Sequence, residues 1–345
     1  MNIRTSRTFF AASALAAVMF GGSALAAGLE TNIVVYSTHG EDMLEVVADA
    51  FTKETGVKVE FINLKGELAD RVRAEKANPQ SDIMYGAPSS VFLELKGEGL
   101  FEAFTPSWAA DIDPLFKDAE GYWYGTIQTP VVMFYNTEVV ARDEAPKDWS
   151  DLVRPEYRGQ LVFRNGLSSS ARATYTALLQ QYERRNDLEN GWAFLKGLDA
   201  NTKQYFGSGS LLFQAIGRKE AGIGFAVLSE VVDNKTKNNM PLEMIDAASG
   251  SPIITDGIAL IRGAKHPEAA RAFLDFAGGA KIQALLAKSF NRMPTHPAAF
   301  ADAPQWMADT RIKAMDVDWG ALASKQSEWM QKWDTEVKDS GKDKK

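Results

Sequence analysis

Short apolar runs that alternate with helix-patterned segments constrain the fold of this 345-residue chain most strongly. Residues 32–36 predict a buried strand, 41–55 repeat apolar residues at helical spacing before Gly56, and 57–62 alternate like a second strand. A glycine placed there is typical of a helix end, because it adopts left-handed backbone without a steric cost. This strand–helix–strand order predicts an α/β fold built on a parallel sheet.

Later regions of the chain repeat the same order. A helix over 67–76 precedes a strand over 82–85, and a strand over 160–164 precedes a helix over 171–184. Further strands are predicted over 131–135, 221–228 and 253–260, further helices over 191–198 and 211–218 and from Pro267 onward, and an aromatic hairpin over 121–125. A chain of roughly 320 residues behind its leader favours two domains over one.

The two ends of the chain are expected to lie outside the folded body. The first 26 residues have basic Arg4 and Arg7, an apolar stretch, and a small-residue ending at Ala26, which predicts a cleaved signal peptide and a periplasmic protein. A membrane anchor would need about 18 uninterrupted apolar residues, and the stretch at 9–20 is shorter. No cysteine follows to carry a lipid. The polar segment 338–345 is expected to be a disordered tail.

Composition excludes several kinds of function. The net charge is −7, and the leader removes two positive charges and no negative one, so nucleic acid is not an expected partner. The absence of cysteine excludes disulfides and thiolate metal sites. No G-x-S-x-G, S-x-x-K, H-E-x-x-H, G-x-x-x-x-G-K or G-x-G-x-x-G occurs, which argues against an enzyme and predicts no cofactor.

Small polar clusters stand where predicted strands end and helices begin. In open α/β sheets ligands bind outside the carboxyl ends of the strands, and free N–H groups at a helix start attract anions. The clusters are Ser37-Thr38-His39, Ser89-Ser90, Ser168-Ser169-Ser170 and Ser208-Gly209-Ser210. Each alone could be a helix cap and nothing more. Together they favour one cleft that binds an anion.

Charged residues near these clusters extend the prediction. Arg164, Arg172 and His39 could add positive charge to the cleft. Glu230 and Asp256 could accept hydrogen bonds from hydroxyls or an amine of a ligand, although Asp256 could equally hold the hinge through a salt bridge or cap.

Other candidate residues are given structural roles. His266 and His296 each adjoin a proline and are expected in surface turns. Histidines so dispersed, with no cysteine, do not support a metal site. Tyr122-Trp123-Tyr124 is expected in the core, because aromatic side chains bury much area.

Several segments resemble the type 2 periplasmic binding proteins, in the branch of ferric-iron, phosphonate and sugar-phosphate binders. The resemblance rests on IVVYSTHGEDMLEVVADAFTKETGVKVEFI, SDIMYGAPSS, GYWYGTIQTPVVMFYNT, PEYRGQLVF and TDGIALIRGAKHPEAARAFLDF. It implies two lobes, each a mixed sheet flanked by helices, joined by two crossing strands. Lobe 1 would comprise 27–129 and 255–337, with the C-terminal helices packing across the lobes, and lobe 2 would comprise 130–254.

The resemblance also implies a function. The protein would be a monomeric substrate-binding subunit that closes over a small solute and delivers it to the membrane permease of an ABC importer, with no bond made or broken. A sensory binding protein, or an exported lyase or hydrolase on the same scaffold, stays open as an alternative.

The sequence departs from the iron binders at their ligand positions. Those proteins use a histidine, a glutamate and two adjacent tyrosines, whereas this chain has His39, Ala87 and the tyrosine-free stretch 226–231. Ferric iron prefers anionic oxygen ligands, and the absence of the glutamate and the two tyrosines removes most of them. Iron bound through a synergistic anion is therefore the secondary alternative.

The primary prediction is a phosphorylated or phosphonate ligand with Glu230 near its hydroxyl or amine end. The predicted ligand-binding residues are Ser37, Thr38, His39, Ala87, Pro88, Ser89, Gln128, Asn165, Ser168, Ser169, Ser170, Arg172, Ser208, Glu230 and Asp256.

Overall fold

The computed structural model describes residues 29–64, 67–310 and 312–340. The signal peptide predicted over 1–26 lies outside the described residues. No helix in the described part of the chain is long and apolar enough to cross a membrane.

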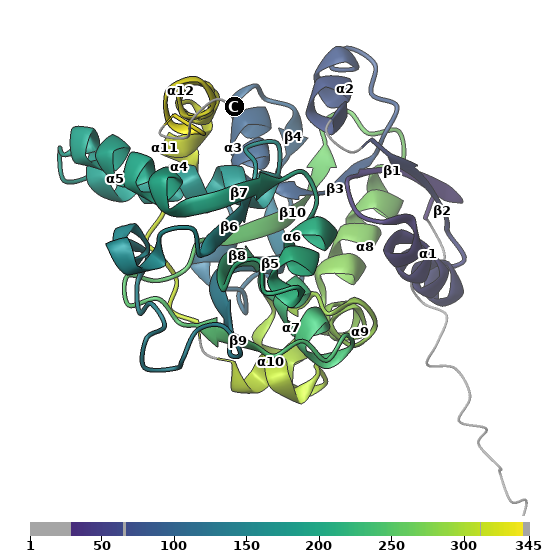
Figure 1. The fold of residues 1–345 in the computed structure, drawn as a ribbon. Helices are drawn as coiled ribbons and strands as arrows, with labels where there is room; N and C mark the ends of the chain where they lie inside the picture. Colours follow the sequence, from purple (N-terminus) through teal and green to yellow (C-terminus); the bar gives the residue numbers. More distant parts are fainter. Residues whose placement is uncertain (1–28, 65–66, 311, 341–345) are drawn as a thin grey trace, which may run out of the picture.

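Lobe 1 begins with the strand–helix alternation that the sequence predicts (Figure 1). β1 pairs in parallel with β2 on one side and β3 on the other. The helix α1 ends at Gly56, whose φ of 80° is left-handed. The elements are β1 (Asn32–Ser37), α1 (Glu41–Thr55), β2 (Lys58–Asn63), α2 (Leu68–Ala74), β3 (Ile83–Pro88), α3 (Ser89–Gly97), β4 (Phe101–Glu102) and a 3₁₀ turn at Pro114–Phe116.

Two long strands, β5 (Tyr124–Asn136) and β10 (Ile253–Ile261), run side by side at the junction between the lobes. β5 pairs with β10 as far as Pro130, and from Val131 it pairs with β8 (Ile223–Val227) and β9 (Leu242–Ile245). The hairpin-like segment predicted over 121–125 is present: Lys117 forms an antiparallel bridge with Tyr124, and Tyr124 begins β5. Proline has no N–H to donate, which suits a point where the strand changes partners.

Lobe 2 is a second mixed sheet covered by helices. β6 pairs in parallel with β7 and β8, while β5 pairs antiparallel with β8. The sequence reasoning missed β7 and β9, which are short. The elements are 3₁₀ turns at Trp149–Val153 and Pro155–Tyr157, β6 (Leu161–Arg164), α4 (Ser169–Glu183), α5 (Leu188–Asn201), β7 (Thr202–Phe206), α6 (Gly209–Gly217), β8, α7 (Leu228–Thr236) and β9.

The rest of the chain divides between the lobes. α8 buries Phe273 in the lobe 1 core, and α9 buries Ile282 there. Trp329, Met330 and Trp333 instead pack into the lobe 2 core, and α11 and α12 lie beside α4 (Figure 1). The elements are α8 (Pro267–Gly278), α9 (Ala280–Phe290), β11 (Met293–Pro294), a 3₁₀ turn at Pro297–Ala301, α10 (Gln305–Asp309), α11 (Trp319–Ala323), α12 (Gln326–Lys332) and a π-helical turn at Trp333–Val337.

This packing refines the predicted lobe boundary. The sequence assigned 255–337 to lobe 1, with the C-terminal helices packing across the lobes, and residues from Met315 to Val337 contribute to the lobe 2 core. α11 also contacts α3 of lobe 1, as a helix that packs across the lobes would. Three residues of the predicted tail are also described, and the N–H of Asp339 donates to Asp199 Oδ1 at 2.9 Å.

Candidate ligand-binding cleft

A cleft of about 820 Å³ lies between the lobes. Its floor includes Thr129 and Ile254, one from each of the two long strands that join the lobes. Its walls include most of the residues that the sequence singled out: Thr38, His39, Ala87, Pro88, Ser168, Ser169, Ser170, Glu230 and Asp256. The carboxyl ends of β1, β3 and β6 therefore meet at one site, as the clustering of small polar loops predicted.

Three predicted residues support the fold and do not line the cleft. Ser37 is fully buried, donates to the carbonyl of Tyr85 at 2.6 Å and accepts from the N–H of His39 at 3.1 Å. Ser89 is buried at the start of α3. Gln128 donates from Nε2 to the carbonyl of Pro294 at 2.7 Å.

Three others lie elsewhere on lobe 2. Asn165 and Arg172 line a separate cavity of about 470 Å³ beside α12 and Trp333. Ser208 caps α6 and accepts from the N–H of Leu211 at 3.3 Å, which is the purely structural role that the sequence analysis allowed.

The serines before α4 behave differently from Ser208. The hydroxyls of Ser168 and Ser170 lie 3.0 Å apart and bond each other, and Ser168 makes no side-chain cap bond to the helix. The first-turn N–H groups of α4 are therefore not capped by Ser168 and lie at the wall of the cleft. A helix start of this kind is favourable for an anion.

Two arginines face the cleft from opposite lobes. Arg164 ends β6 in lobe 2, and Arg292 follows α9 in lobe 1. The Nε atom of each is buried and has no hydrogen-bond partner among the described residues, and neither guanidinium forms an ion pair with them. Arg164 Nη2 donates to the carbonyl of Gly207 at 3.1 Å. A buried guanidinium nitrogen without a partner is costly unless a ligand completes its hydrogen bonds.

The sequence reasoning missed Arg292. Arg292 lies away from the strand ends, just after α9, whose C-cap residue Asn291 has a φ of 53°. An asparagine in left-handed backbone at a helix end is a recognisable stop signal. Only the packing of α9 against lobe 1 brings the next residue to the cleft.

His39 does not add charge to the cleft, contrary to the expectation. The side chain is buried with 5 % exposure, and burial, helped by Arg292, lowers the pKa of His39 to about 3. Its Nε2 has no hydrogen-bond partner among the described residues. The neutral ring can therefore donate or accept one hydrogen bond to a ligand.

Two carboxylic acids share the cleft with the arginines. Burial raises the pKa of Asp256 to about 6, while Arg292 opposes the shift. Glu230 is accessible to solvent at the cleft wall, yet surrounding protein raises its pKa too, with Arg164 and Arg292 opposing. The predicted salt bridge at Asp256 is not formed with any described residue. Both acids are thus placed to accept hydrogen bonds from a ligand.

Left-handed backbone brings the β1 and β3 loops together at the cleft. Gly86 and Ala87 have φ of 101° and 77°, and the N–H of Ala87 donates to Thr38 Oγ1 at 2.8 Å. A Cβ on Gly86 would lie 2.7 Å from Thr38 Oγ1 and 3.0 Å from His39 Nε2. Only glycine permits this approach.

The remaining histidines and the aromatic segment have structural surroundings. His296 is buried with 6 % exposure, so its predicted surface position is wrong, and half-buried His266 lies 2.9 Å from Asp82 Oδ2. Trp123 and Tyr124 are buried, which confirms their predicted place in the core. The described residues contain no group of three or more histidines, cysteines or acids that could hold a metal ion.

Known proteins match this chain over most of its length. The family model for bacterial extracellular solute-binding proteins matches residues 78–319. A probable ABC transporter periplasmic-binding protein of Sinorhizobium fredii is 30% identical over 320 residues, which cover 90% of this chain and 87% of the relative.

Solved structures share the fold. A periplasmic binding protein of Actinobacillus pleuropneumoniae with exogenous fructose-6-phosphate bound superposes with a TM-score of 0.72 at 24% identity, covering 90% of this chain and 99% of that one. The apo ferric ion-binding protein A of Pasteurella haemolytica superposes with a TM-score of 0.78 at 20% identity, covering 88% and 97%. With the two lobes, the crossing strands and the cleft between them, these matches show that the chain belongs to the bacterial extracellular solute-binding proteins.

Proposed function

We propose that the protein captures an organic phosphate or phosphonate in the periplasm and delivers it to the permease of an ABC importer. The observation that carries the proposal is the pair Arg164 and Arg292, one guanidinium from each lobe, each with a buried and unpartnered Nε at the cleft. Arginine binds phosphoryl oxygens through paired N–H donors, and the first turn of α4 adds backbone N–H groups.

The position of the arginines links binding to movement. An anion that contacts both guanidinium groups interacts with both lobes at once, so it favours the arrangement in which the lobes are close. A bound solute would thereby favour closure, and the mechanism needs no chemical step. A monomer suffices, because both arginines belong to one chain.

Acidic residues in the same cleft suit the remainder of the solute. Glu230 and Asp256 accept hydrogen bonds, and neutral His39 offers one more polar nitrogen. A molecule with an anionic end and hydroxyl or amine groups fits this arrangement better than a bare anion. The fructose-6-phosphate complex of the Actinobacillus protein is consistent with such a solute on this fold.

Calorimetric titration of the mature protein tests the proposal. The solutes are glucose 6-phosphate, phosphoglycerate, 2-aminoethylphosphonate and ferric citrate. We expect saturable binding of at least one organophosphorus compound and no tight binding of ferric citrate. Tight binding of iron with no response to the phosphorus compounds would overturn the proposal and favour the iron alternative.

A further inference from the structure

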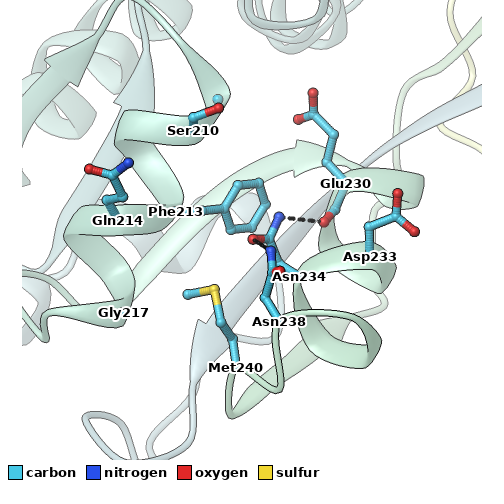
Figure 2. Close-up of a pocket in the computed structure, with 10 residues that line it drawn as sticks. Ser210, Phe213, Gln214, Gly217, Glu230, Asp233, Asn234, Asn238 and Met240 are labelled. Carbon is cyan, nitrogen blue, oxygen red and sulfur yellow. Dashed lines mark hydrogen bonds between the residues drawn. The ribbon is translucent and has the colours of Figure 1, made fainter.

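A polar groove of about 450 Å³ lies between α6 and α7 on lobe 2 (Figure 2). Each helix lines it with residues spaced three or four positions apart, so one face of each helix meets the groove. The phenyl ring of Phe213 projects between the helices, near Asn234. The lining residues are Gly209, Ser210, Phe213, Gln214 and Gly217 from α6, Glu230, Asp233 and Asn234 from α7, and Asn238 and Met240 after it.

The groove adjoins the cleft. Glu230 and Asp233 line both cavities, and Gly209 marks the junction. A Cβ on Gly209 would lie 3.4 Å from Arg164 Nη1 and 3.4 Å from each carboxylate oxygen of Glu230. The arginine of the cleft and the acid of the groove therefore both border the space beside Gly209, into which a side chain at residue 209 would project.

The groove offers acceptors and donors for hydroxyl groups. The carboxylate of Glu230 and the amide of Gln214 make no hydrogen bond or ion pair with any residue that the structure describes. Asn234 donates to the main-chain carbonyl of Glu230 at 2.8 Å and accepts from Asn238 Nδ2 at 3.0 Å, which holds both amides along the groove. Carboxylates accept and amides both donate and accept, as polyhydroxylated molecules require.

Asp233 is committed to structural contacts. It accepts from Asn291 Nδ2 at 2.6 Å across the lobes and lies 3.0 Å from Lys237 Nζ. Its charge is thus compensated, and Glu230 is left as the acid that faces both the groove and the arginine.

We propose that the α6–α7 groove is a second compartment of the binding site, which holds the hydroxyl-bearing tail of a solute whose anionic end contacts Arg164 and Arg292. This inference rests on the proposed function. It specifies the solute as an elongated polyol phosphate or phosphonate that passes Gly209 and contacts Glu230, Gln214 and Asn238.

The test compares inorganic phosphate with fructose 6-phosphate in calorimetric titrations of the mature protein and two variants. Gly209→Ala places a methyl group at the junction, and Gln214→Leu removes an exposed amide from the groove. We expect the wild-type protein to prefer fructose 6-phosphate, Gly209→Ala to weaken it about tenfold and Gln214→Leu about threefold. Neither variant should change phosphate affinity by more than about twofold.

Gly97→Ala is the matched control, because Gly97 also belongs to a helix and a Cβ there meets nothing within 4 Å. It should leave both affinities unchanged. Equal weakening of phosphate and fructose 6-phosphate, or no preference for the sugar phosphate, would overturn the groove assignment, while the proposed function would stand if one of the organophosphorus compounds bound. Absence of binding of fructose 6-phosphate and of all those compounds would overturn the two together.

Discussion

The two lobes differ in how their cores are completed. The lobe 1 core combines β1, β3 and α1 with α8 and α9, so it is closed by segments that precede residue 295. The lobe 2 core instead takes Met315, Trp329 and Trp333 from the end of the chain. Lobe 2 therefore depends on a part of the sequence that is far from its own strands.

Because its last segments pack in lobe 2, the chain crosses between the lobes a third time. After β11 the chain leaves lobe 1, and Ser251, just before β10, bonds it by donating to the carbonyl of Lys313 at 2.8 Å and accepting from the N–H of Met315 at 2.9 Å. This third crossing thus lies beside the start of β10, at the junction of the lobes.

The lobes are more alike where they face the cleft. Lobe 1 presents Arg292 with Asp256, and lobe 2 presents Arg164 with Glu230. Neither acid forms an ion pair with a described residue. The difference lies in solvent access, since Asp256 is partly buried and Glu230 is exposed. The two lobes therefore differ in how their cores are stabilised, but each contributes one arginine and one acid to the cleft.

Of the substitutions that test this comparison, Trp333→Ala should have the largest effect, a loss of stability. Trp333 is 1 % exposed and stacks on Tyr175 with ring centroids 4.7 Å apart. Removing a buried tryptophan side chain costs about 3–5 kcal/mol, so the free energy of unfolding measured in urea should fall by that amount. Trp306, which is partly exposed, is the control, and Trp306→Ala should cost about 1 kcal/mol. Equal losses would contradict the dependence of lobe 2 on the C-terminal segment.

Removal of either cleft arginine should weaken the binding of an organophosphate comparably, because each lobe contributes one. Hydrogen bonds to charged groups contribute about 1.5–3 kcal/mol, so Arg164→Ala and Arg292→Ala should each lower affinity by roughly 10- to 150-fold. Arg172→Ala, in the separate cavity, should change affinity less than about twofold. Calorimetry checks all three, and an effect of Arg172→Ala as large as the others would refute the assignment.

Gly86→Ala should separate backbone strain from crowding at the cleft. The new methyl group would meet Thr38 Oγ1 and His39 Nε2 as well as an unfavourable φ of 101°, so we expect a loss of about 2 kcal/mol and weaker ligand binding. Gly56→Ala has a similar φ of 80° but open space around it, so it should cost about 1 kcal/mol and leave affinity unchanged. Thermal unfolding and titration measure the two effects, and identical behaviour of the variants would exclude a role for crowding.

Asp256→Asn should have the smallest effect, one that depends on pH. The pKa of Asp256 is raised from 3.8 to about 6, so between these values the native state binds more protons than the unfolded state. Stability from this group falls as pH rises through that window and then stays constant. A shift of about two pKa units corresponds to about 3 kcal/mol at most, and solvent access to this partly buried carboxyl group reduces it. The variant should therefore be more stable than the wild type by about 1 kcal/mol at pH 7.5, and the gain should vanish near pH 4. Thermal unfolding at both pH values checks this, and a gain that does not change with pH would contradict it.

Local patterns predicted much of the scaffold. The bounds of α1 and its stop at Gly56 follow from apolar spacing and glycine chemistry, β1 follows from a β-branched run, and β6 follows from a short apolar run. Strand ends that carry small polar loops also predicted Thr38, Ala87 and Ser168–Ser170 at one cleft. The equally short β9 was missed, because an acidic residue interrupts its apolar residues and only Ile245 is β-branched.

The sequence by itself determined the α/β alternation, the small polar loops at the strand ends and the lack of the tyrosines that iron binders use, because these are properties of short segments. Only the tertiary structure decided that Arg292 joins Arg164 at the cleft, that His39 is neutral, and that the last helices complete lobe 2. An amphipathic helix shows that one face is buried but not against which partner. Burial, and with it the protonation of a side chain, likewise depends on residues far away in the chain.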